Sequence, residues 1–346
     1  MSKKAIGVHG SSALSYTDHI TPLCQILDIP LLVTDPWIFE LTELYYPKMH
    51  LIYESPSNYD LSPHLKDYDA FVTVSHFKKF QGGYLMGDYL VRSEAKSIYS
   101  LHGNSDKKRD LFWVEQCLEE DIVLLYGEFF RDFIKEKGVY HRLSHPILCG
   151  NYRLEFYKNH KEFFQKKISP HLFKDSNRMS ILYAPTWSSP NKKSEWRVDY
   201  SSYLSIHSQI LNTIPSNFQI YVKTHPFMEQ LYPKEMTEIR QCYEKNPQVK
   251  FIEDCPLIYP LLEHIDVYLG DYSSIGYDFL YFDRPLLFLN DGHRDLDLCG
   301  TKVTPDKIYH ALEKEDTKSE IRKKTYSYSF THIPLSQLKR EVEAFL

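Results

Sequence analysis

The sequence predicts an α/β protein built from two Rossmann-like domains that face each other across a cleft. Short apolar runs typical of buried parallel strands alternate with amphipathic runs typical of helices along most of the chain. This alternation restarts near residue 152, and a length of 346 residues suits two domains of ordinary size. We therefore expect one domain over residues 1–152 and a second over residues 153–346, with the last helices free to cross back.

In the first half, apolar runs predict strands at residues 5–8, 31–33, 51–53, 68–74, 98–101, 122–126 and 146–150. Helical spacing predicts helices at residues 17–27, 109–119 and 129–137. A long Lys-rich helix over residues 153–173 is expected to join the halves, with Phe156, Phe163 and Phe164 on one side. Its basic side is either an ordinary solvated face, which we favour, or a membrane contact.

In the second half, strands are expected at residues 180–183, 218–222, 250–252, 267–269 and 286–289. Helices are expected at residues 203–214, 235–244, 257–264, 304–312 and 341–346, with a Lys/Arg-rich segment at 318–324. Residues 266–290 form the clearest unit, because a strand, a Ser-rich turn, a helix and another strand follow one another. The start of that helix suits an anion such as a diphosphate, although Ser273 or Ser274 could equally serve as an ordinary N-cap.

Composition excludes several classes of protein. The net charge of −5 does not indicate nucleic acid as the main partner. No apolar run approaches the roughly 20 residues that cross a bilayer, and the N-terminus does not resemble a signal peptide. The six cysteines are scattered without a CxxC pair, which indicates reduced thiols and a cytoplasmic protein.

Five polar clusters directly follow predicted strands. They are HGN from His102, GNYR from Gly150, PTW from Pro185, KTHP from Lys223 and DYSS from Asp271. Because the carboxyl ends of parallel strands share one edge of a sheet, these clusters gather histidines, cations and hydroxyls there. Such a set suits group transfer from a nucleotide diphosphate, with cations neutralising the diphosphate and an imidazole taking a proton.

The strings YAPTW, KTHP and DYSSIGYDFLYFDRPLLFL, in this spacing, resemble the CDP-glycerol glycerophosphotransferase family, whose members build teichoic-acid-type polymers. The resemblance is strong over residues 180–291 and traceable over residues 97–153. It implies the GT-B fold, an acceptor-side first domain and a donor-binding second domain. It also implies no metal and no cofactor, although Asp295 and Asp297 form a DxD.

The resemblance assigns roles to individual residues. His102 corresponds to the family's catalytic base, and His225 is the second catalytic histidine, which stabilises the diphosphate. The positions that correspond to donor contacts are Gly103, Asn104, Arg153, Pro185, Thr186, Lys223, Ser273, Ser274 and Asp278.

The chain departs from the family pattern at three places. The first motif reads HGNSDKK where the family has HGTPLK, so Asn104 replaces a threonine. Lys223 replaces an arginine, and a lysine cannot bind phosphate through two parallel hydrogen bonds as an arginine does. Tyr152 replaces a proline. These departures leave the donor, the acceptor and the activity of the altered motif open.

The resulting expectation is transfer of glycerol phosphate, or a related polyol phosphate, from a CDP-linked donor to a hydroxyl acceptor with release of CMP. The acceptor would be a lipid-linked sugar, a growing polymer or a capsule glycan. The alternatives are a nucleotide-sugar glycosyltransferase, an enzyme similar to UDP-sugar 2-epimerases, and a non-catalytic homologue. A cytoplasmic protein is expected, with peripheral attachment to the inner membrane face through residues 158–174 as an option and with no nucleic-acid partner.

Overall fold

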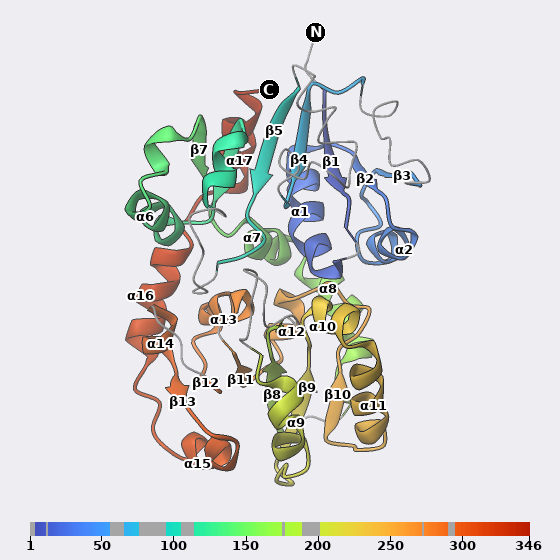
Figure 1. Cartoon of the computed structure of the whole chain (residues 1–346), viewed down its shortest axis with the longest axis vertical. Helices are drawn as coiled ribbons and strands as arrows, with labels where there is room; N and C mark the ends of the chain where they lie inside the picture. Colours follow the sequence, from blue (N-terminus) through green and yellow to red (C-terminus); the bar gives the residue numbers. More distant parts are fainter. Residues whose placement is uncertain are drawn as a thin grey trace. The chain divides into compact units, whose positions relative to one another are not determined.

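The fold was obtained as a computed structural model that describes residues 4–11, 13–55, 66–75, 95–104, 114–174, 177–188, 201–271, 273–289 and 295–346 (Figure 1). The chain divides into two compact units. Unit 1 holds the described residues up to Asn104, those from 114 to Phe164 and those from Ser327 onward. Unit 2 holds the described residues from Gln165 to Tyr326.

Unit 1 contains a seven-stranded parallel sheet in the order β3-β2-β1-β4-β5-β6-β7. Its strands are β1 (Ala5–His9), β2 (Leu31–Val33), β3 (Leu51–Tyr53), β4 (Ala70–Thr73), β5 (Lys96–Ser100), β6 (Ile122–Leu125) and β7 (His145–Leu148). Every pair in the sheet is parallel. The strand order changes direction at β1, as in a doubly wound sheet, where ligands bind beyond the carboxyl ends of the strands.

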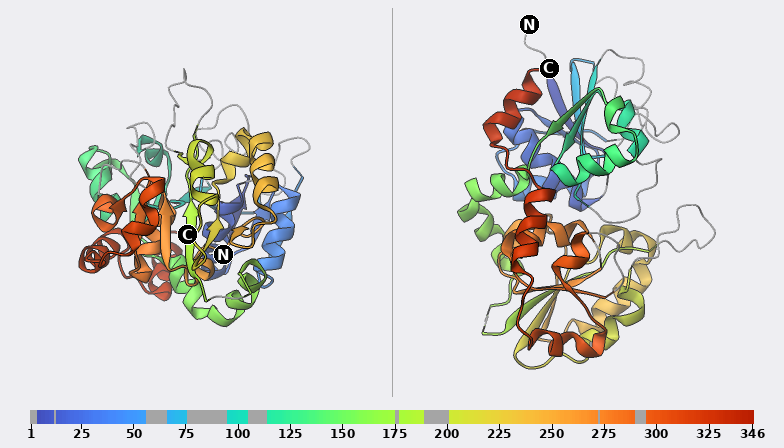
Figure 2. Two further views of the ribbon diagram at one scale, coloured as in Figure 1. Left: turned by 90° about the horizontal axis from the view of Figure 1, so that it is seen from below. Right: turned by 90° about the vertical axis from the view of Figure 1, so that its left-hand side faces the viewer.

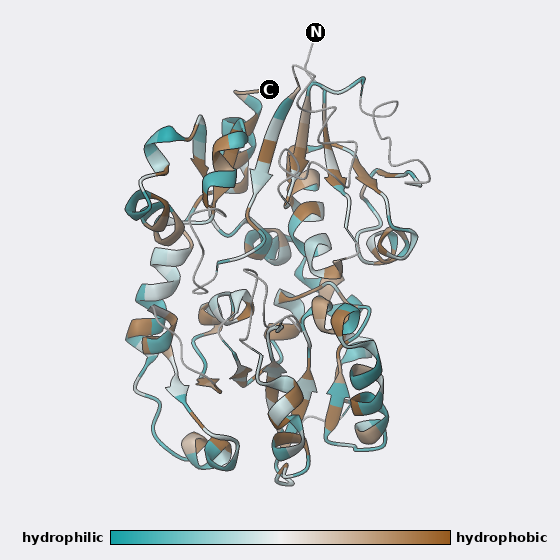
Figure 3. Ribbon diagram, in the orientation of Figure 1, coloured by the Kyte–Doolittle hydropathy of each residue, from teal (hydrophilic) through white to brown (hydrophobic). Residues whose placement is uncertain are grey.

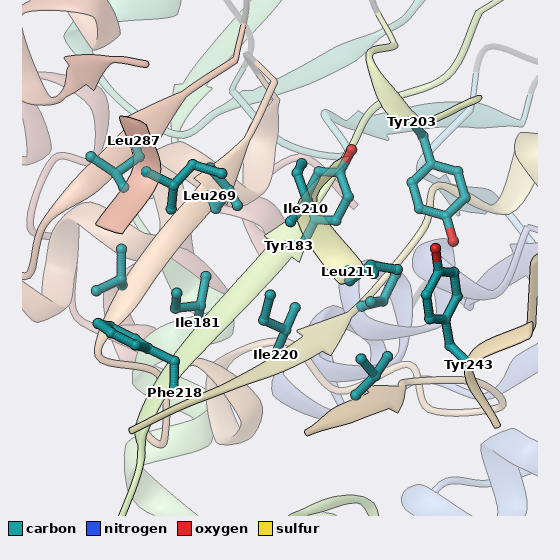
Figure 4. Packing of buried hydrophobic residues seen from close by; sticks show 14 of the residues in the cluster. Ile181, Tyr183, Tyr203, Ile210, Leu211, Phe218, Ile220, Tyr243, Leu269 and Leu287 are labelled. Carbon is teal, nitrogen blue, oxygen red and sulfur yellow. The ribbon is translucent and has the colours of Figure 1, made fainter. Parts of the chain in front are cut away.

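Unit 2 repeats this arrangement with a six-stranded parallel sheet in the order β10-β9-β8-β11-β12-β13. Its strands are β8 (Met179–Ala184), β9 (Phe218–Val222), β10 (Val249–Phe251), β11 (Val267–Gly270), β12 (Leu286–Phe288) and β13 (Thr301–Lys302). Figure 4 shows Ile181, Ile220 and Leu269 from three neighbouring strands, all fully buried in one apolar cluster. The predicted α/β class with two Rossmann-like parallel sheets is thereby confirmed.

Helices pack against each sheet through apolar faces. Those of unit 1 are η1 (Leu14–Tyr16), α1 (Thr17–Leu27), α2 (Pro36–Tyr45), η2 (Gln116–Glu119), α6 (Glu128–Glu136), η3 (Tyr140–Arg142), α7 (Tyr152–Asn159) and α17 (Leu335–Glu343). Helix α8 (Lys161–Ile168) leads into unit 2. Although α17 comes from the end of the chain, it packs on α1 beside the first strands (Figure 2).

The helices of unit 2 include α9 (Tyr203–Leu211) and α11 (Pro233–Tyr243). The others are η4 (Ser169–His171), α10 (Pro226–Leu231), α12 (Tyr259–Leu262), α13 (Ser274–Phe279), η5 (Leu280–Phe282), α14 (Asp295–Cys299), η6 (Pro305–Lys307) and α15 (Ile308–Leu312). Helix α16 (Ser319–Ser329) begins in unit 2 and ends in unit 1. In Figure 3, helix α11 carries both polar and apolar residues, as expected for a helix that covers a sheet and faces water.

The expected single helix over residues 153–173 is wrong, because the chain forms α7 and α8 with a break at His160. The His160 imidazole donates from Nδ1 to the carbonyl of Phe156, at 2.9 Å, and so competes with continuation of the backbone pattern. The chain also leaves unit 1 only after Phe164. Helix α7 stays in unit 1 because it packs on α1 and because Arg153 forms an ion pair with Asp18.

Local patterns also missed or misplaced several helices. Helix α2 was not predicted, although Asp35 followed by Pro36 is a start signal and the Asp35 carboxylate accepts from the Ile38 N–H. Helix α16 occupies the Lys/Arg-rich segment, and the last helix covers Leu335–Glu343 rather than residues 341–346. Most of the helix expected at 109–119 lies outside the described residues, and η2 forms within the described part.

Candidate active site

His102 follows β5 at the carboxyl edge of the unit 1 sheet. Its Nδ1 lies 2.9 Å from the carbonyl oxygen of Val74, which follows β4. Because a carbonyl oxygen only accepts, Nδ1 carries the hydrogen and the lone pair of the neutral ring is on Nε2. The side chain is exposed. This geometry presents a basic nitrogen at the sheet edge.

The ring of His102 is also held from one side by an aromatic contact. Tyr16, at the end of η1, places its ring centroid 4.8 Å from that of His102, with 43° between the planes. On its other side Tyr16 lies 6.3 Å from the ring of His9, at the end of β1. Two strand ends and η1 thus bring three rings together, and the sequence indicated only His9 and His102 as strand-end residues.

A buried hydrogen-bond chain supports the backbone just before His102. The Tyr126 hydroxyl donates to the carbonyl of Leu101 at 3.0 Å, and His19 Nδ1 lies 2.8 Å from the same hydroxyl. Since the Tyr126 proton is given to Leu101, His19 donates to the tyrosine oxygen. Burial, followed by electrostatic interactions with Arg153 and His102, holds the pKa of His19 well below its usual value. The ring therefore stays neutral in the folded protein.

These buried histidines predict acid sensitivity. Burial lowers the pKa of His9 to about 4, while the unfolded ring protonates near 6.5. Below about pH 6.5 the unfolded state therefore binds more protons, and the free energy of unfolding should fall as pH falls toward 4. At pH 5 we expect a loss of roughly 2 kcal/mol from His9 alone. Urea unfolding at pH 7 and pH 5 measures it, and His9→Gln should reduce the difference. Equal values at both pH values would contradict the prediction.

Arg153, predicted at the diphosphate, is held within unit 1. Its Nη2 lies 2.6 Å from Oδ2 of Asp18, and its Nε donates to the Asp18 carbonyl at 3.2 Å. The side chain is only 4% exposed. Tyr46 donates to the other Asp18 oxygen at 3.0 Å. The structure thus shows a buried ion pair between α1 and α7, and the diphosphate role of Arg153 stays a prediction.

In unit 2, His225 follows β9 and stands at the N-cap of α10. Its Nδ1 accepts from the backbone N–H of Phe227 at 3.2 Å, so in the neutral ring the hydrogen is on Nε2. The rings of Trp187 and Phe227 lie 6.1 and 5.2 Å from the imidazole. His225 therefore has the opposite tautomer to His102, with a donor on the distal nitrogen.

Lys223 precedes this histidine and is half-buried. Its Nζ donates to the carbonyl of Cys255 at 2.8 Å. That bond joins the ammonium group to the loop that follows β10. The predicted diphosphate contact of Lys223 stays a prediction.

The Ser273-Ser274 turn follows β11, and Ser273 occupies the N-cap position of α13. Its side chain makes no capping hydrogen bond, and its Oγ lies 3.1 Å from the Tyr268 hydroxyl instead. Ser273 therefore occupies the N-cap position, as the alternative interpretation expected, but its hydroxyl does not cap the helix. Both serines are half-buried.

Asp271, to which sequence reasoning gave no role, connects three segments at this edge. Its fully buried carboxylate accepts through Oδ2 from the N–H groups of Thr186, at 3.0 Å, and Ser202, at 3.2 Å. The Tyr268 hydroxyl donates to the Asp271 carbonyl at 2.8 Å. The signal was present, because Asp271 opens the DYSS string and an aspartate there can accept from neighbouring turns.

We expect Asp271→Asn to weaken donor binding about tenfold, because a neutral amide oxygen is a weaker acceptor for both N–H groups than the charged Oδ2 and the turns would shift. Calorimetric titration with CDP-glycerol measures the affinity. Asp266→Asn is a matched control, since Asp266 Oδ2 accepts from Ser180 N–H at 2.8 Å at the opposite end of the same strands. Equal affinities for the two variants and the wild type would contradict this role.

Asp278, predicted to bind a donor hydroxyl, is 3% exposed and accepts from the Tyr259 hydroxyl at 2.6 Å. This bond ties α13 to α12, so the structure supplies a partner inside unit 2. Pro185 and Thr186 are buried at the end of β8. The donor roles of these three residues stay predictions.

The structure thus forms two groups of predicted residues, one in each unit. His102, Gly103, Asn104 and Arg153 belong to unit 1. Those of unit 2 follow the adjacent strands β9, β8 and β11. They are Pro185, Thr186, Lys223, His225, Ser273, Ser274 and Asp278.

Comparison with known proteins finds similarity over part of the chain. The family model described as CDP-Glycerol:Poly(glycerophosphate) glycerophosphotransferase matches residues 140–295, which is less than half of the chain. This segment is similar to the CDP-glycerol glycerophosphotransferase family. The resemblance inferred from the motifs is thereby confirmed. A curated relative, the teichoic acid glycerol-phosphate primase of Bacillus spizizenii, is 28% identical over 163 residues, which make up 47% of this chain and 37% of the relative.

Solved structures share the fold of this chain. The wall teichoic acid polymerase TagF, in a CDPG soak, aligns with a TM-score of 0.68 at 13% identity, over 99% of this chain and 87% of that chain. UDP-GlcNAc 2-epimerase from Neisseria meningitidis, bound to UDP-GlcNAc, aligns with a TM-score of 0.57 at 14% identity, over 98% of each chain. These likenesses establish the GT-B type of fold. Across the described part of the chain, no helix has both the length and the apolar character needed to cross a bilayer.

Proposed function

We propose that this protein transfers glycerol phosphate, or a related polyol phosphate, from a CDP-linked donor to a hydroxyl acceptor in the synthesis of a cell-surface polymer. The main support for the proposal is that His102 and His225 have opposite tautomers. His102 Nδ1 donates to Val74 and leaves a basic Nε2, whereas His225 Nδ1 accepts from Phe227 and leaves Nε2–H as a donor. One ring is suited to remove a proton and the other to stabilise negative charge.

In this reaction the acceptor oxygen attacks the phosphorus that carries the glycerol. His102 Nε2 takes the acceptor proton as the new P–O bond forms. The bond from that phosphorus to the oxygen shared with CMP breaks, and CMP departs with the electron pair. His225 Nε2–H, the Lys223 ammonium and the N–H groups at Ser273 and Ser274 stabilise the charge that moves to CMP. The similarity to the family and these side chains support the scheme.

A second candidate is a UDP-sugar enzyme of the same fold, either a glycosyltransferase or an epimerase. The likeness to UDP-GlcNAc 2-epimerase favours it at the level of fold. A thermal-shift screen against CDP-glycerol, CDP-ribitol, CMP-sugars and UDP-sugars separates the candidates. Stabilisation by a CDP-polyol and release of CMP support transfer of polyol phosphate, whereas selective stabilisation by a UDP-sugar contradicts it. Binding of a CDP-polyol without CMP release, for every acceptor tried, would indicate a non-catalytic homologue.

The acceptor in this proposal is a hydroxyl on a lipid-linked sugar, a growing polymer or a capsule glycan, reached at the inner face of the membrane. Peripheral contact through residues 158–174 is consistent with exposed Phe163, Lys166 and Lys174. Co-sedimentation with phosphatidylglycerol vesicles tests this contact. Replacing Lys166 and Lys174 by Glu should reduce binding, and unchanged binding would exclude this surface.

A further inference from the structure

The residues from 327 to 331, which we call the crossover segment, lie against the carboxyl edge of the unit 1 sheet. The Thr331 N–H donates to the carbonyl of Tyr126, directly after β6, at 3.0 Å. Phe330 packs edge-on against the Tyr126 ring, with centroids 5.6 Å apart, and is 4% exposed. The Tyr328 hydroxyl donates to Asp132 on α6 at 3.3 Å. A segment late in the chain thus covers an edge where ligands commonly bind in such sheets.

Two glycines allow this close approach. A Cβ on Gly127, after β6, would lie 2.6 Å from the carbonyl oxygen of Ser329. A Cβ on Gly150, after β7, would lie 2.5 Å from the carbonyl oxygen of Thr331, and Gly150 has a φ of +62° that disfavours other residues. The strand ends and the crossover segment are therefore in direct backbone contact.

The crossover segment is joined to the loop of the proposed base through Asn104. The Asn104 side chain is fully buried, and its Nδ2 donates to the Ser329 carbonyl at 3.0 Å. Asn104 is two residues beyond His102, and the residue between them, Gly103, has a φ of +121°. Because glycine permits many backbone conformations, the residues on both sides of Gly103 need hydrogen bonds that fix the loop. The Val74 carbonyl supplies one at His102, and the Ser329 carbonyl supplies the other at Asn104.

We propose that Asn104 is a positioning residue that holds the His102 imidazole in its Nδ1–H orientation by anchoring the loop to the crossover segment. The proposal rests on the proposed function, in which His102 takes the acceptor proton. In this proposal the asparagine of the altered HGN motif positions the base instead of contacting the CDP-linked donor. It also makes the crossover segment part of what orients the base.

Asn104→Asp tests this role, because it keeps the shape and replaces the donating amide with an acceptor that repels the Ser329 carbonyl. With CDP-glycerol as donor and alkyl glycosides or glycerol as acceptors, kcat for CMP release should fall about 10- to 100-fold. The KM for CDP-glycerol should stay within about twofold, because the groups that stabilise the diphosphate in the proposed reaction, His225, Lys223 and the Ser273-Ser274 turn, belong to unit 2. In Gly127→Ala the added Cβ would clash with the same Ser329 carbonyl, so kcat should fall and KM should stay nearly unchanged in this variant as well.

Tyr328→Phe is the matched control, since it removes the crossover segment's bond to Asp132 and leaves the Ser329 carbonyl untouched. Nitrogen-15 NMR of the histidine rings supplies a readout that does not need turnover. The His102 signals are assigned by their disappearance in the His102→Asn spectrum. They should show mainly the Nδ1–H tautomer in the wild type and a mixture of both tautomers in Asn104→Asp and Gly127→Ala.

The outcomes separate this inference from the proposed function. A wild type that releases no CMP from any CDP-polyol contradicts the function, while the NMR comparison still decides the role of Asn104. An unchanged His102 tautomer in both variants overturns the inference, as does a kcat equal to that of Tyr328→Phe.

Discussion

His102→Asn should lower kcat for CMP release by about 10²- to 10⁴-fold, the usual contribution of a general base. The substitution is chosen because the asparagine amide can still donate to the Val74 carbonyl, as His102 Nδ1 does at 2.9 Å. What is lost is the basic Nε2. Affinity for CDP-glycerol, measured by calorimetry, should stay near the wild-type value, because the groups that stabilise the diphosphate in the proposed reaction are in unit 2.

His160→Asn is the matched control for this variant. The His160 ring also donates from Nδ1 to a backbone carbonyl at 2.9 Å, and it also belongs to unit 1, but it caps a break between two helices. The control should retain turnover. If kcat of His102→Asn were within about threefold of the control value, His102 would not be the base.

His225→Asn should lower kcat by about 10²- to 10³-fold, an effect typical of removing a donor that stabilises transition-state charge. Asparagine is a good N-cap and can still accept from the Phe227 N–H, which His225 Nδ1 does at 3.2 Å. The donor on Nε2 has no counterpart in the shorter side chain. Pre-steady-state CMP release from CDP-glycerol measures the loss.

Two comparisons show whether this loss is chemical or structural. His225→Ala removes the cap as well and should also cost about 1 kcal/mol in the free energy of unfolding, whereas His225→Asn should not. His207→Asn is the control histidine in unit 2, because its Nδ1 donates to the Tyr203 carbonyl at 2.9 Å on α9. If His225→Asn were as active as His207→Asn, His225 would have no role in stabilising the diphosphate.

Much of the fold could be predicted from local sequence. Apolar runs of strand length marked most of the strands, since strands that are buried on both faces must be apolar along their length. The turns after those strands carry the polar residues, so the position of each cluster at a carboxyl end could be predicted as well. The DYSS string and its neighbours also led to the family whose model matches residues 140–295.

Other features depended on partners far away in the sequence. Arg153 is predicted to contact a phosphate, and in the fold it also pairs with a carboxylate 135 residues earlier. Asn104 is predicted to lie in a donor loop, and it also donates to a carbonyl 225 residues later. A buried polar group must find a partner, and any of many segments could supply it, so local sequence does not identify which one does.

The sequence by itself therefore determined the alternation of strands and helices, the family resemblance, and the strand-end positions of the two histidines. Only the tertiary structure decided which nitrogen of each histidine carries the hydrogen, because the deciding groups are backbone atoms of Val74 and Phe227. It also decided that the crossover segment returns to unit 1. Both outcomes follow from backbone hydrogen bonding at particular distances, which residue types alone do not specify.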